Sequence, residues 1–539
     1  MSCEVQFTPE SGTPNARVVR AFYDGSLTWR ARLYVSETGW WRWTARCPDL
    51  TAIDPSEGRF RAISSTLRGM LRSHPQNSRQ WATDDGRSFL SVGDTAYRLF
   101  APTERAWKEY LRDDRELGIT LVRAGAFGGW EWDLNRQGWW ALVRRVDRRA
   151  YSNTPWSDAA ATEFDLAAFR TTEERLAWML DNCPELYVEL IIFGLKSWAH
   201  DDTGSVWQAI SEQTRRKTME YIIARFAAFP QILWQVVNDI HIDPDFPNNR
   251  AFVREVGRYF TAHDPWAHLL TIGPNREGIA PFIDPETDWA DFVHLQGSYE
   301  LGADRIHEYD DEPKHVMLAE DRYEQDGFRT EPLHPDYFYR WLFWSWLLSG
   351  GSATYGSRFN VLHPYSQTAG LPFTNFYDKS HRYNTRLEGL DSTRWIGKYF
   401  SDRRIELWQF VSDDSLASDL DGRVGRRRPK LARRGYEEFL VYHPNAFVAD
   451  RNARPAEITA RLSVNLERAL GEFQLEWFRP SDGKALLGPR LTAGRHITLV
   501  SPWRGLDVLA RLHRPNTSVD RTPARDKSHR EVKSLRQSL

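Results

Sequence analysis

The feature that most constrains the fold is an alternation of short apolar segments with longer amphipathic ones between residues 89 and 355. The apolar segments predict buried strands at 89–93, 119–124, 186–193, 232–237, 268–273, 292–297, 315–320 and 352–355. Helical periodicity falls between them, at 103–117, 171–182, 206–229, 250–262 and 335–348. Eight strands alternating with helices over roughly 300 residues match the size of a (β/α)8 barrel. A doubly wound sheet is less favoured because no Gly-rich phosphate loop follows the first strand.

On both sides of this region the pattern is typical of β-structure. The segments "LTWRARLYV" (27–35) and "GWWRWTARC" (39–47) predict a hairpin, and strands are expected at 404–411, 435–444, 457–464 and 506–514. Since 539 residues exceed what one core serves, several domains are expected. The prediction is an α/β chain with a TIM barrel flanked by two β-sandwich domains. The boundaries are an Ig-like sandwich at 1–62, the barrel at 63–395, the second sandwich at 396–514 and a polar, disordered tail at 515–539.

Composition and charge limit the partners. The formal net charge is −2, which gives no reason to expect nucleic acid or an anionic membrane as a partner, and no apolar stretch is long enough to span a bilayer. The three cysteines show no metal-binding spacing and the N-terminus shows no signal peptide, so a reducing, cytoplasmic location is predicted. The 24 Trp, 20 Tyr and 28 Phe fit large cores and also suit stacking on sugar rings.

In a (β/α)8 barrel the active site lies at the carboxyl ends of the strands, so polar residues that end apolar runs are the candidates. The run "ILWQVV" is followed by Asn238, Asp239 and, two positions later, His241. The run "HVMLA" is followed by Glu320. Glycoside hydrolysis needs one carboxyl group that protonates the leaving oxygen and a second that acts as nucleophile or base.

Asp239 therefore fits the acid/base and Glu320 the nucleophile, with Asn238 available to bond the sugar 2-hydroxyl. The positions differ by 320 − 239 = 81 residues, which places them on strands four and seven, facing each other across the barrel mouth. A separation of roughly 5 Å, typical of retaining enzymes, is then feasible. A second reading of Asn238-Asp239 is a cap on the following loop.

Other polar or aromatic residues near strand ends are predicted to bind substrate. They are Asp94, Arg123, Trp130, Trp198, His241, His294, Gln296, Tyr323 and Tyr355. A turn or helix-cap role fits Asp94 equally well. One of His294 and Gln296 is expected to point into the mouth, and Trp130 and Trp198 are candidate stacking platforms. Glu324 reads as a surface charge. No metal-ligand spacing is present, and the proposed chemistry needs no metal or cofactor.

Three further segments give the chain a specific resemblance. "FLSVGDTAY" (89–97), "AEDRYE" (319–324) and "WSWLLSGGSATYGSRF" (344–359), in this order and spacing, resemble the apiosidase-like group of barrel glycoside hydrolases. In that group an Asp stands where many barrel hydrolases carry the acid/base Glu, as Asp239 does here. The resemblance implies a sandwich before and after the barrel. The chain departs from the pattern at Ala96-Tyr97 and at the Val-Val-Asn before Asp239, which bears on the substrate more than on the reaction.

The leading hypothesis is a retaining glycosidase, exo- or endo-acting, with an oligo- or polysaccharide as substrate. A non-catalytic carbohydrate-binding barrel is the second hypothesis, because an Asp side chain reaches less far than a Glu. A barrel isomerase or lyase is the third. It would need metal ligands or a Lys base at the strand ends, where only Lys196 is found. The sequence indicates no oligomeric state.

Overall fold

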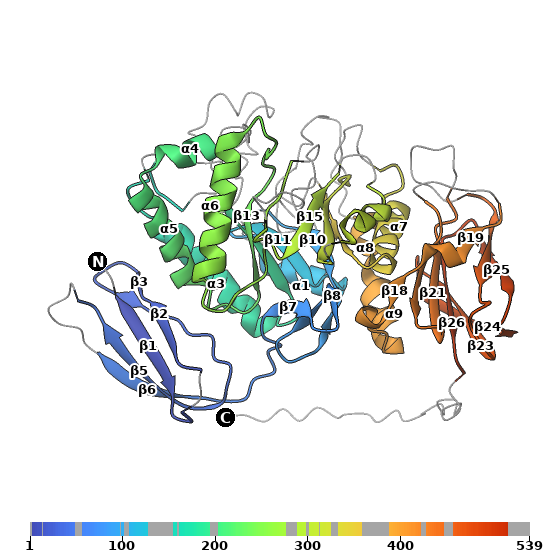
Figure 1. Ribbon diagram of the computed structural model, residues 1–539, viewed down its shortest axis with the longest axis horizontal. Coiled ribbons are helices and arrows are strands. Elements are labelled where there is room, and N and C mark those ends of the chain that lie inside the picture. The colour runs from blue at the N-terminus through green and yellow to red at the C-terminus, as the bar shows by residue number, and fades with distance from the viewer. Residues whose placement is uncertain are drawn as a thin grey trace, which may run out of the picture.

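The computed structural model gives the arrangement of most of the chain (Figure 1). It describes residues 3–12, 15–48, 56–97, 99–101, 107–127, 155–158, 161–194, 203–275, 288–297, 301–311, 313–324, 332–357, 387–421, 427–446 and 456–515. Of the predicted tail, only residue 515 is among them.

The centre of the molecule is a parallel barrel. Its strands are β10 (Val92–Thr95), β11 (Leu121–Gly125), β12 (Tyr187–Phe193), β13 (Ile232–Val237), β14 (Leu270–Thr271), β15 (Phe292–Gln296), β16 (His315–Glu320) and β17 (Ser352–Tyr355). Neighbouring strands are hydrogen-bonded in the order β14-β13-β12-β11-β10-β17-β16-β15. Between the two end strands, Asp291 N donates to Leu270 O at 2.8 Å and Thr271 Oγ1 to Phe292 O at 2.9 Å. The predicted (β/α)8 fold is confirmed.

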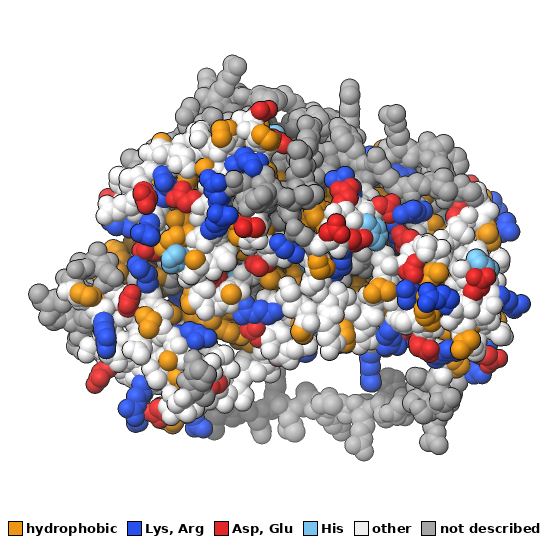
Figure 2. Space-filling model, in the orientation of Figure 1, with side chains coloured by type: hydrophobic (Ala, Val, Ile, Leu, Met, Phe, Trp, Pro, Cys, Tyr) orange, Lys and Arg blue, Asp and Glu red, His pale blue; other side chains and the backbone are white. Residues whose placement is uncertain are grey.

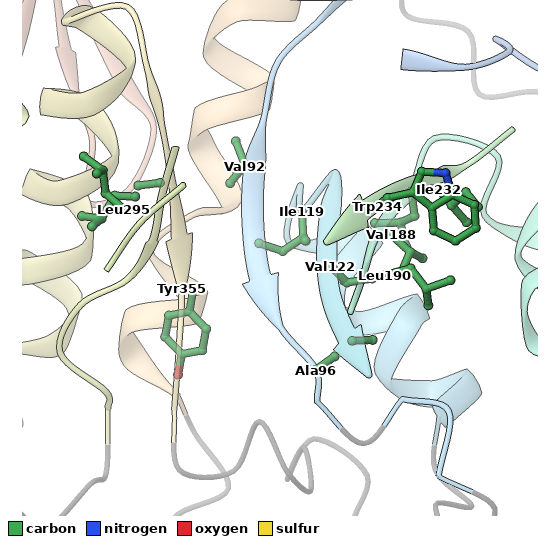
Figure 3. Packing of buried hydrophobic residues seen from close by; sticks show 14 of the residues in the cluster. Val92, Ala96, Ile119, Val122, Val188, Leu190, Ile232, Trp234, Leu295 and Tyr355 are labelled. Atoms are coloured by element: carbon green, nitrogen blue, oxygen red, sulfur yellow. The ribbon is translucent and has the colours of Figure 1, made fainter. Parts of the chain in front are cut away.

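Helices surround the barrel and bury its outer face. They are α1 (Trp107–Glu116), α3 (Leu166–Asn182), α4 (Thr203–Ala209), α5 (Glu212–Phe226), α6 (Pro247–His263), α7 (Pro335–Leu348), α8 (Glu388–Asp391) and α9 (Arg394–Arg403). The outward residues of the strands, such as Val122, Val188 and Trp234, join one large core with them (Figure 3). The single helix predicted over 206–229 is wrong, because Ser211 caps a new helix by accepting from Thr214 N at 3.2 Å.

The amino-terminal end of the barrel is closed by a small antiparallel sheet. Its strands are β7 (Leu71–His74), β8 (Asn77–Thr83) and β9 (Ser88–Phe89). The turn between β8 and β9 contains Gly86 at φ +81°, a conformation that favours glycine. Trp81 stacks edge-on against Phe292 with ring centroids 5.2 Å apart, and Phe89 does the same to Tyr187 at 5.0 Å. This apolar floor leaves the opposite, carboxyl end for polar groups.

The N-terminal sheet pairs β2 (Arg17–Arg20), β1 (Glu4–Pro9), β5 (Gly39–Arg46) and β6 (Glu57–Ala62), beside a ribbon of β3 (Phe22–Tyr23) and β4 (Trp29–Arg30). The hairpin predicted from 27–35 and 39–47 is wrong, because β5 pairs with β1 and β6 instead. Cys3 and Cys47 flank the β1–β5 ladder and form a disulfide.

The C-terminal region forms two antiparallel sheets with a shared apolar core. One contains β18 (Val411–Ser412), β20 (Lys430–Arg434), β21 (Glu438–His443), β26 (Val508–His513), β23 (Glu472–Arg479) and β24 (Lys484–Thr492), and the other contains β19 (Ala417–Asp419), β22 (Thr459–Asn465) and β25 (His496–Arg504). The strand predicted at 404–411 is wrong, since a 3-10 turn, Leu407–Gln409, lies in its middle and β18 begins only at Val411. Sheets therefore flank the barrel on both sides, as predicted, and the proposed domain boundaries stay predictions.

The surface matches the near-zero net charge. Acidic and basic side chains intermingle over the face shown in Figure 2, without a broad patch of one sign among the described residues. None of the helices in the described ranges has the length and apolar character needed to cross a bilayer.

Candidate active site

Glu320 ends β16 and is 2% exposed. The β15–β16 ladder carries a bulge here: Leu295 is opposite Leu318, whereas Gln296 is opposite Glu320. The extra residue on β16 breaks the usual alternation, and bulges commonly redirect a side chain next to an active site. Ala319 belongs to the cluster of barrel-interior side chains, yet its neighbour Glu320 contacts the interior residue Arg123.

Several donors converge on one oxygen of the Glu320 carboxyl group. Oε1 accepts from the Tyr97 hydroxyl, from Arg123 Nη1 at 3.3 Å and Nη2 at 3.2 Å, and from Asn238 Nδ2 at 3.3 Å. Burial and the nearby Glu320 charge raise the pKa of Tyr97 well above its usual value, so Tyr97 acts as a neutral donor. This many donors favour the ionised carboxylate that a nucleophile requires.

Asp239 follows Asn238 at the end of β13, in the left-handed conformation at φ +53°. Adjacent side chains of a regular strand point to opposite faces, and this bend lets both reach one residue. One end of the Gln296 amide lies 2.6 Å from Asp239 Oδ1, and the other lies 2.9 Å from Asn238 Oδ1. Asp239 is half-buried, whereas Asn238 is buried. The strand end thus gives one half-buried carboxyl group and one buried amide that holds its neighbours.

A charged layer lies beneath these groups, inside the barrel. Arg123 and Glu189, both fully buried, form an ion pair with Nε and Oε2 3.2 Å apart. Arg123 Nη1 donates to Ala319 O and Nη2 to Asn238 Oδ1, each at 2.8 Å. Burial opposes the charge of Arg123, but the surrounding negative groups, Glu320 and Glu189 among them, outweigh it and raise its pKa. The guanidinium is therefore a permanent cation between two acidic side chains.

The structure places most of the other predicted residues near Glu320 or Asp239. We expected only one of His294 and Gln296 to point into the barrel. Both do, because residues two apart on a strand share a face. Tyr323 is buried after β16, close enough to Tyr97 and Arg123 to affect their pKa values. His241 follows Asp239 by two residues, stacks on Phe246 with centroids 4.9 Å apart and lies beside Asn275.

Two predicted residues point elsewhere. The Asp94 carboxyl group accepts from the Tyr110 hydroxyl of α1 at 2.6 Å, so it lies behind β10 and not in the mouth. Burial raises the pKa of Asp94 and of its neighbour Asp114. Tyr355 packs in the core outside the barrel, where its ring is seen at the end of β17 (Figure 3). Trp130 and Trp198 lie outside the described residues, as does Lys196.

Glu324 is not the surface charge expected from the sequence. It is 2% exposed and accepts from the Tyr355 hydroxyl at 2.6 Å and from Gly389 N at 3.0 Å. Burial raises the pKa of Glu324 to about 8. Its position between β16, β17 and α8 makes it a brace for the segment that carries Glu320.

Sequence reasoning missed Tyr97 and Gln235 as site residues. Tyr97 stands two residues after the first strand, where the strand-end rule could have found it. Gln235 lies inside an apolar run, and its Nε2 donates to Asn238 Oδ1 at 2.9 Å. In the part of the chain that the structure describes, no group of three or more His, Cys, Asp or Glu could hold a metal ion.

A model of the catalytic domain of the apiosidase-like family matches residues 75–406, which is more than half of the chain. The chain belongs to the apiosidase-like family. The matched region contains the whole barrel and every residue described above as contacting Glu320 or Asp239. The glycoside hydrolase class predicted from the sequence is confirmed by this membership.

Solved structures with the same fold carry related names. A putative glycoside hydrolase from Bacteroides vulgatus has 17% identity and a TM-score of 0.63, covering 95% of each chain. A family 5 glycoside hydrolase from the same organism has 15% identity and a TM-score of 0.58, covering 83% of this apiosidase-like chain and 94% of its own. A search of the curated proteins gives no match. These likenesses show the shared fold of the apiosidase-like chain.

Proposed function

We propose that this chain cleaves a glycosidic bond with retention of configuration, with Asp239 as acid/base and Glu320 as nucleophile. The observation that carries the proposal is the set of donors from Tyr97, Arg123 and Asn238 on Glu320 Oε1. A buried carboxylate held by a permanent cation and neutral donors is oriented and kept ionised for attack. A protein that only binds sugar has no need of such a group.

The reaction follows from the two carboxyl groups. Protonated Asp239 gives its proton to the leaving oxygen while a Glu320 oxygen attacks the anomeric carbon, so the glycosidic bond breaks and an ester forms. Asp239, now ionised, takes a proton from water. The hydroxide oxygen attacks the same carbon, the ester bond breaks, and Glu320 leaves as a carboxylate. Arg123 and Tyr97 stabilise the charge of Glu320 before and after the covalent stage.

Substrate binding is proposed for Tyr323, His241 and Asn238, with Trp130 and Trp198 remaining predicted stacking residues. The family name makes apiosyl glycosides the first substrates to assay, followed by other oligo- and polysaccharides. The cytoplasmic localisation stays a prediction, and the Cys3–Cys47 disulfide supports an oxidising compartment instead.

The test uses Glu320→Gln and Asp239→Asn on a panel of aryl glycosides. We expect Glu320→Gln to lower kcat by at least about 10³-fold and Asp239→Asn by about 10²–10⁴-fold. Azide should restore turnover of an activated aryl glycoside by Asp239→Asn and release a glycosyl azide of retained configuration. The control is Asp310→Asn, which removes an exposed carboxylate paired with Arg79 near the barrel floor. Unchanged kcat in both site variants, or sugar binding without hydrolysis by the wild type, would refute the proposal.

A further inference from the structure

A buried chain of polar side chains leads from Glu189 to Asp239. Glu189 Oε1 lies 2.9 Å from His294 Nδ1, His294 Nε2 lies 3.3 Å from Gln296 Nε2, and the other end of the Gln296 amide reaches Asp239. Glu189 and His294 are fully buried and Gln296 is 7% exposed. The chain crosses the barrel interior from β12 to β15 and ends at the proposed acid/base.

The direction of the hydrogen bonds is set at the Glu189 end. Carboxylate oxygens accept, so His294 carries its proton on Nδ1 and donates to Glu189. Burial lowers the pKa of His294, although Glu189 opposes this, so the ring is neutral and its Nε2 has a lone pair. That lone pair accepts an N–H of Gln296.

A second contact orients the same amide. Asn238 Oδ1 is an acceptor, because it receives bonds from Arg123 Nη2 at 2.8 Å and Gln235 Nε2 at 2.9 Å. It also accepts from Gln296 Nε2 at 2.9 Å. Two acceptors, His294 Nε2 and Asn238 Oδ1, therefore hold the amide nitrogen on their side.

The amide oxygen of Gln296 consequently faces Asp239 Oδ1 at 2.6 Å and Pro274 O at 3.1 Å. Two acceptors at 2.6 Å repel each other, whereas a protonated carboxyl group donates to an amide oxygen. Turning the amide would satisfy an ionised Asp239 but would place its oxygen 2.9 Å from Asn238 Oδ1. The turned amide would also place its oxygen 3.3 Å from the lone pair of His294 Nε2, whereas the unturned amide beside a protonated Asp239 keeps one longer unfavourable contact, with Pro274 O at 3.1 Å. The unturned amide is therefore the better satisfied of the two, and it fits the protonated carboxyl group.

We propose that Gln296 is a positioning residue that, oriented by Asn238, His294 and Glu189, accepts a hydrogen bond from protonated Asp239 and so keeps the acid proton in place for transfer. The catalytic role of this hydrogen bond rests on the proposed function, since a retaining glycosidase must begin each cycle with a protonated acid. The structural part of the proposal, a hydrogen bond that favours protonated Asp239, is measurable whether or not the protein turns over a given glycoside.

Other titratable groups lie around Asp239 and Gln296, so the measurement must identify the carboxyl group itself. These groups are Tyr97 after β10, Arg123 on β11, Glu189 on β12, His241 after β13, His294 on β15, and Glu320 and Tyr323 from β16. The experiment is carbon-13 NMR of the full chain labelled at the Asp carboxyl carbon, with the Asp239 signal assigned by its loss in Asp239→Asn.

Gln296→Met removes the acceptor while keeping the length of the side chain. We expect the pKa of Asp239 to fall by about half to one unit, the equivalent of one neutral hydrogen bond. Glu189→Gln should lower it too, because an amide at this position can donate to His294 Nδ1, which moves the ring proton to Nε2 and turns the Gln296 amide. The matched control is Gln231→Met, a buried amide that bonds Cys183 O and Leu186 O near the start of β13 and should leave Asp239 unchanged.

An unchanged or raised Asp239 pKa in Gln296→Met overturns the proposal, and an upward shift would show that the amide donates to ionised Asp239. Should Gln296→Met not fold, Gln296→Leu decides by the same criterion. Kinetics give an independent readout: Gln296→Met should slow glycosides with poor leaving groups more than activated aryl glycosides. If the wild type hydrolyses no glycoside, the proposed function fails while the titration still tests the hydrogen bond.

Discussion

Replacing Arg123 by Met tests the charged layer inside the barrel. The substitution keeps the aliphatic length of the side chain but leaves Glu189 and Glu320, 0% and 2% exposed in their side chains, without the cation between them. Breaking a buried ion pair by removing one partner costs about 3–5 kcal/mol, because the remaining charge is buried without compensation. Two further acceptors, Ala319 O and Asn238 Oδ1, each lose a donor at 2.8 Å. We therefore expect Arg123→Met to lower the free energy of unfolding of the barrel by at least about 3 kcal/mol near pH 8.

The pH dependence separates a charge effect from lost packing. Protonation neutralises the carboxylates of Glu189 and Glu320 that have lost their cation. The destabilisation caused by Arg123→Met should therefore shrink steadily as the pH is lowered toward about 4.5. The assay is urea unfolding followed by tryptophan fluorescence at several pH values. The control is Arg258→Met, whose partner Asp288 is 3.5 Å away and exposed, and which should cost less than about 1 kcal/mol. A loss for Arg123→Met as small as that of the control, or one independent of pH, would refute the reasoning.

Three further predictions concern other parts of the chain. Tyr97→Phe removes a neutral donor to the Glu320 carboxylate and should lower kcat/KM by about 10- to 100-fold without loss of fold, and unchanged kinetics would count against its role. Glu324 has its pKa raised from 4.5 to about 8 by burial, so its contribution to stability is present in full below about pH 4.5 and is lost as the pH rises toward about 8. Glu324→Gln should flatten the decline of unfolding free energy over that range, and an unaltered slope would contradict the assignment. Cys3→Ser, which opens the disulfide to Cys47 across a separation of 44 residues, should destabilise the N-terminal sheet by about 4 kcal/mol, and the same loss should follow addition of dithiothreitol to the wild type.

The barrel was predictable because its strands are apolar on both faces and its helices are amphipathic. Residues 232–237 and 315–320 match β13 and β16 in both bounds. The N-terminal sheet was harder, since β5 pairs with β1 from more than thirty residues earlier in the chain, and local alternation does not reveal a distant partner. The floor strands β7 and β8 form a local hairpin, but their mainly polar sequences, "LRSH" and "NSRQWAT", contain no apolar run that would have predicted strands.

Within the site, the strand-end rule located Asp239 and Glu320 and also their partners Asn238, Arg123 and Gln296. It did not locate Tyr97 or Gln235. Glu189 stands in the apolar run "YVELIIF", where a charged residue implies a buried partner of opposite charge, and the sequence does not say that the partner is Arg123. The inward turn of Glu320 depends on the bulge opposite Gln296, and the Asp239 orientation depends on a left-handed φ. The bulge and the left-handed φ are backbone features that no residue pattern in the chain predicts.

The central claim is that Glu320 forms the bond to the anomeric carbon. The most direct measurement is mass spectrometry of the enzyme inactivated by an activated 2-deoxy-2-fluoro glycoside of a sugar that it hydrolyses, followed by peptide mapping. We expect one added fluoroglycosyl group, carried as an ester by Glu320, and no labelling of Glu320→Gln. Label on another residue, or no label together with hydrolysis products of inverted configuration by NMR, would contradict it.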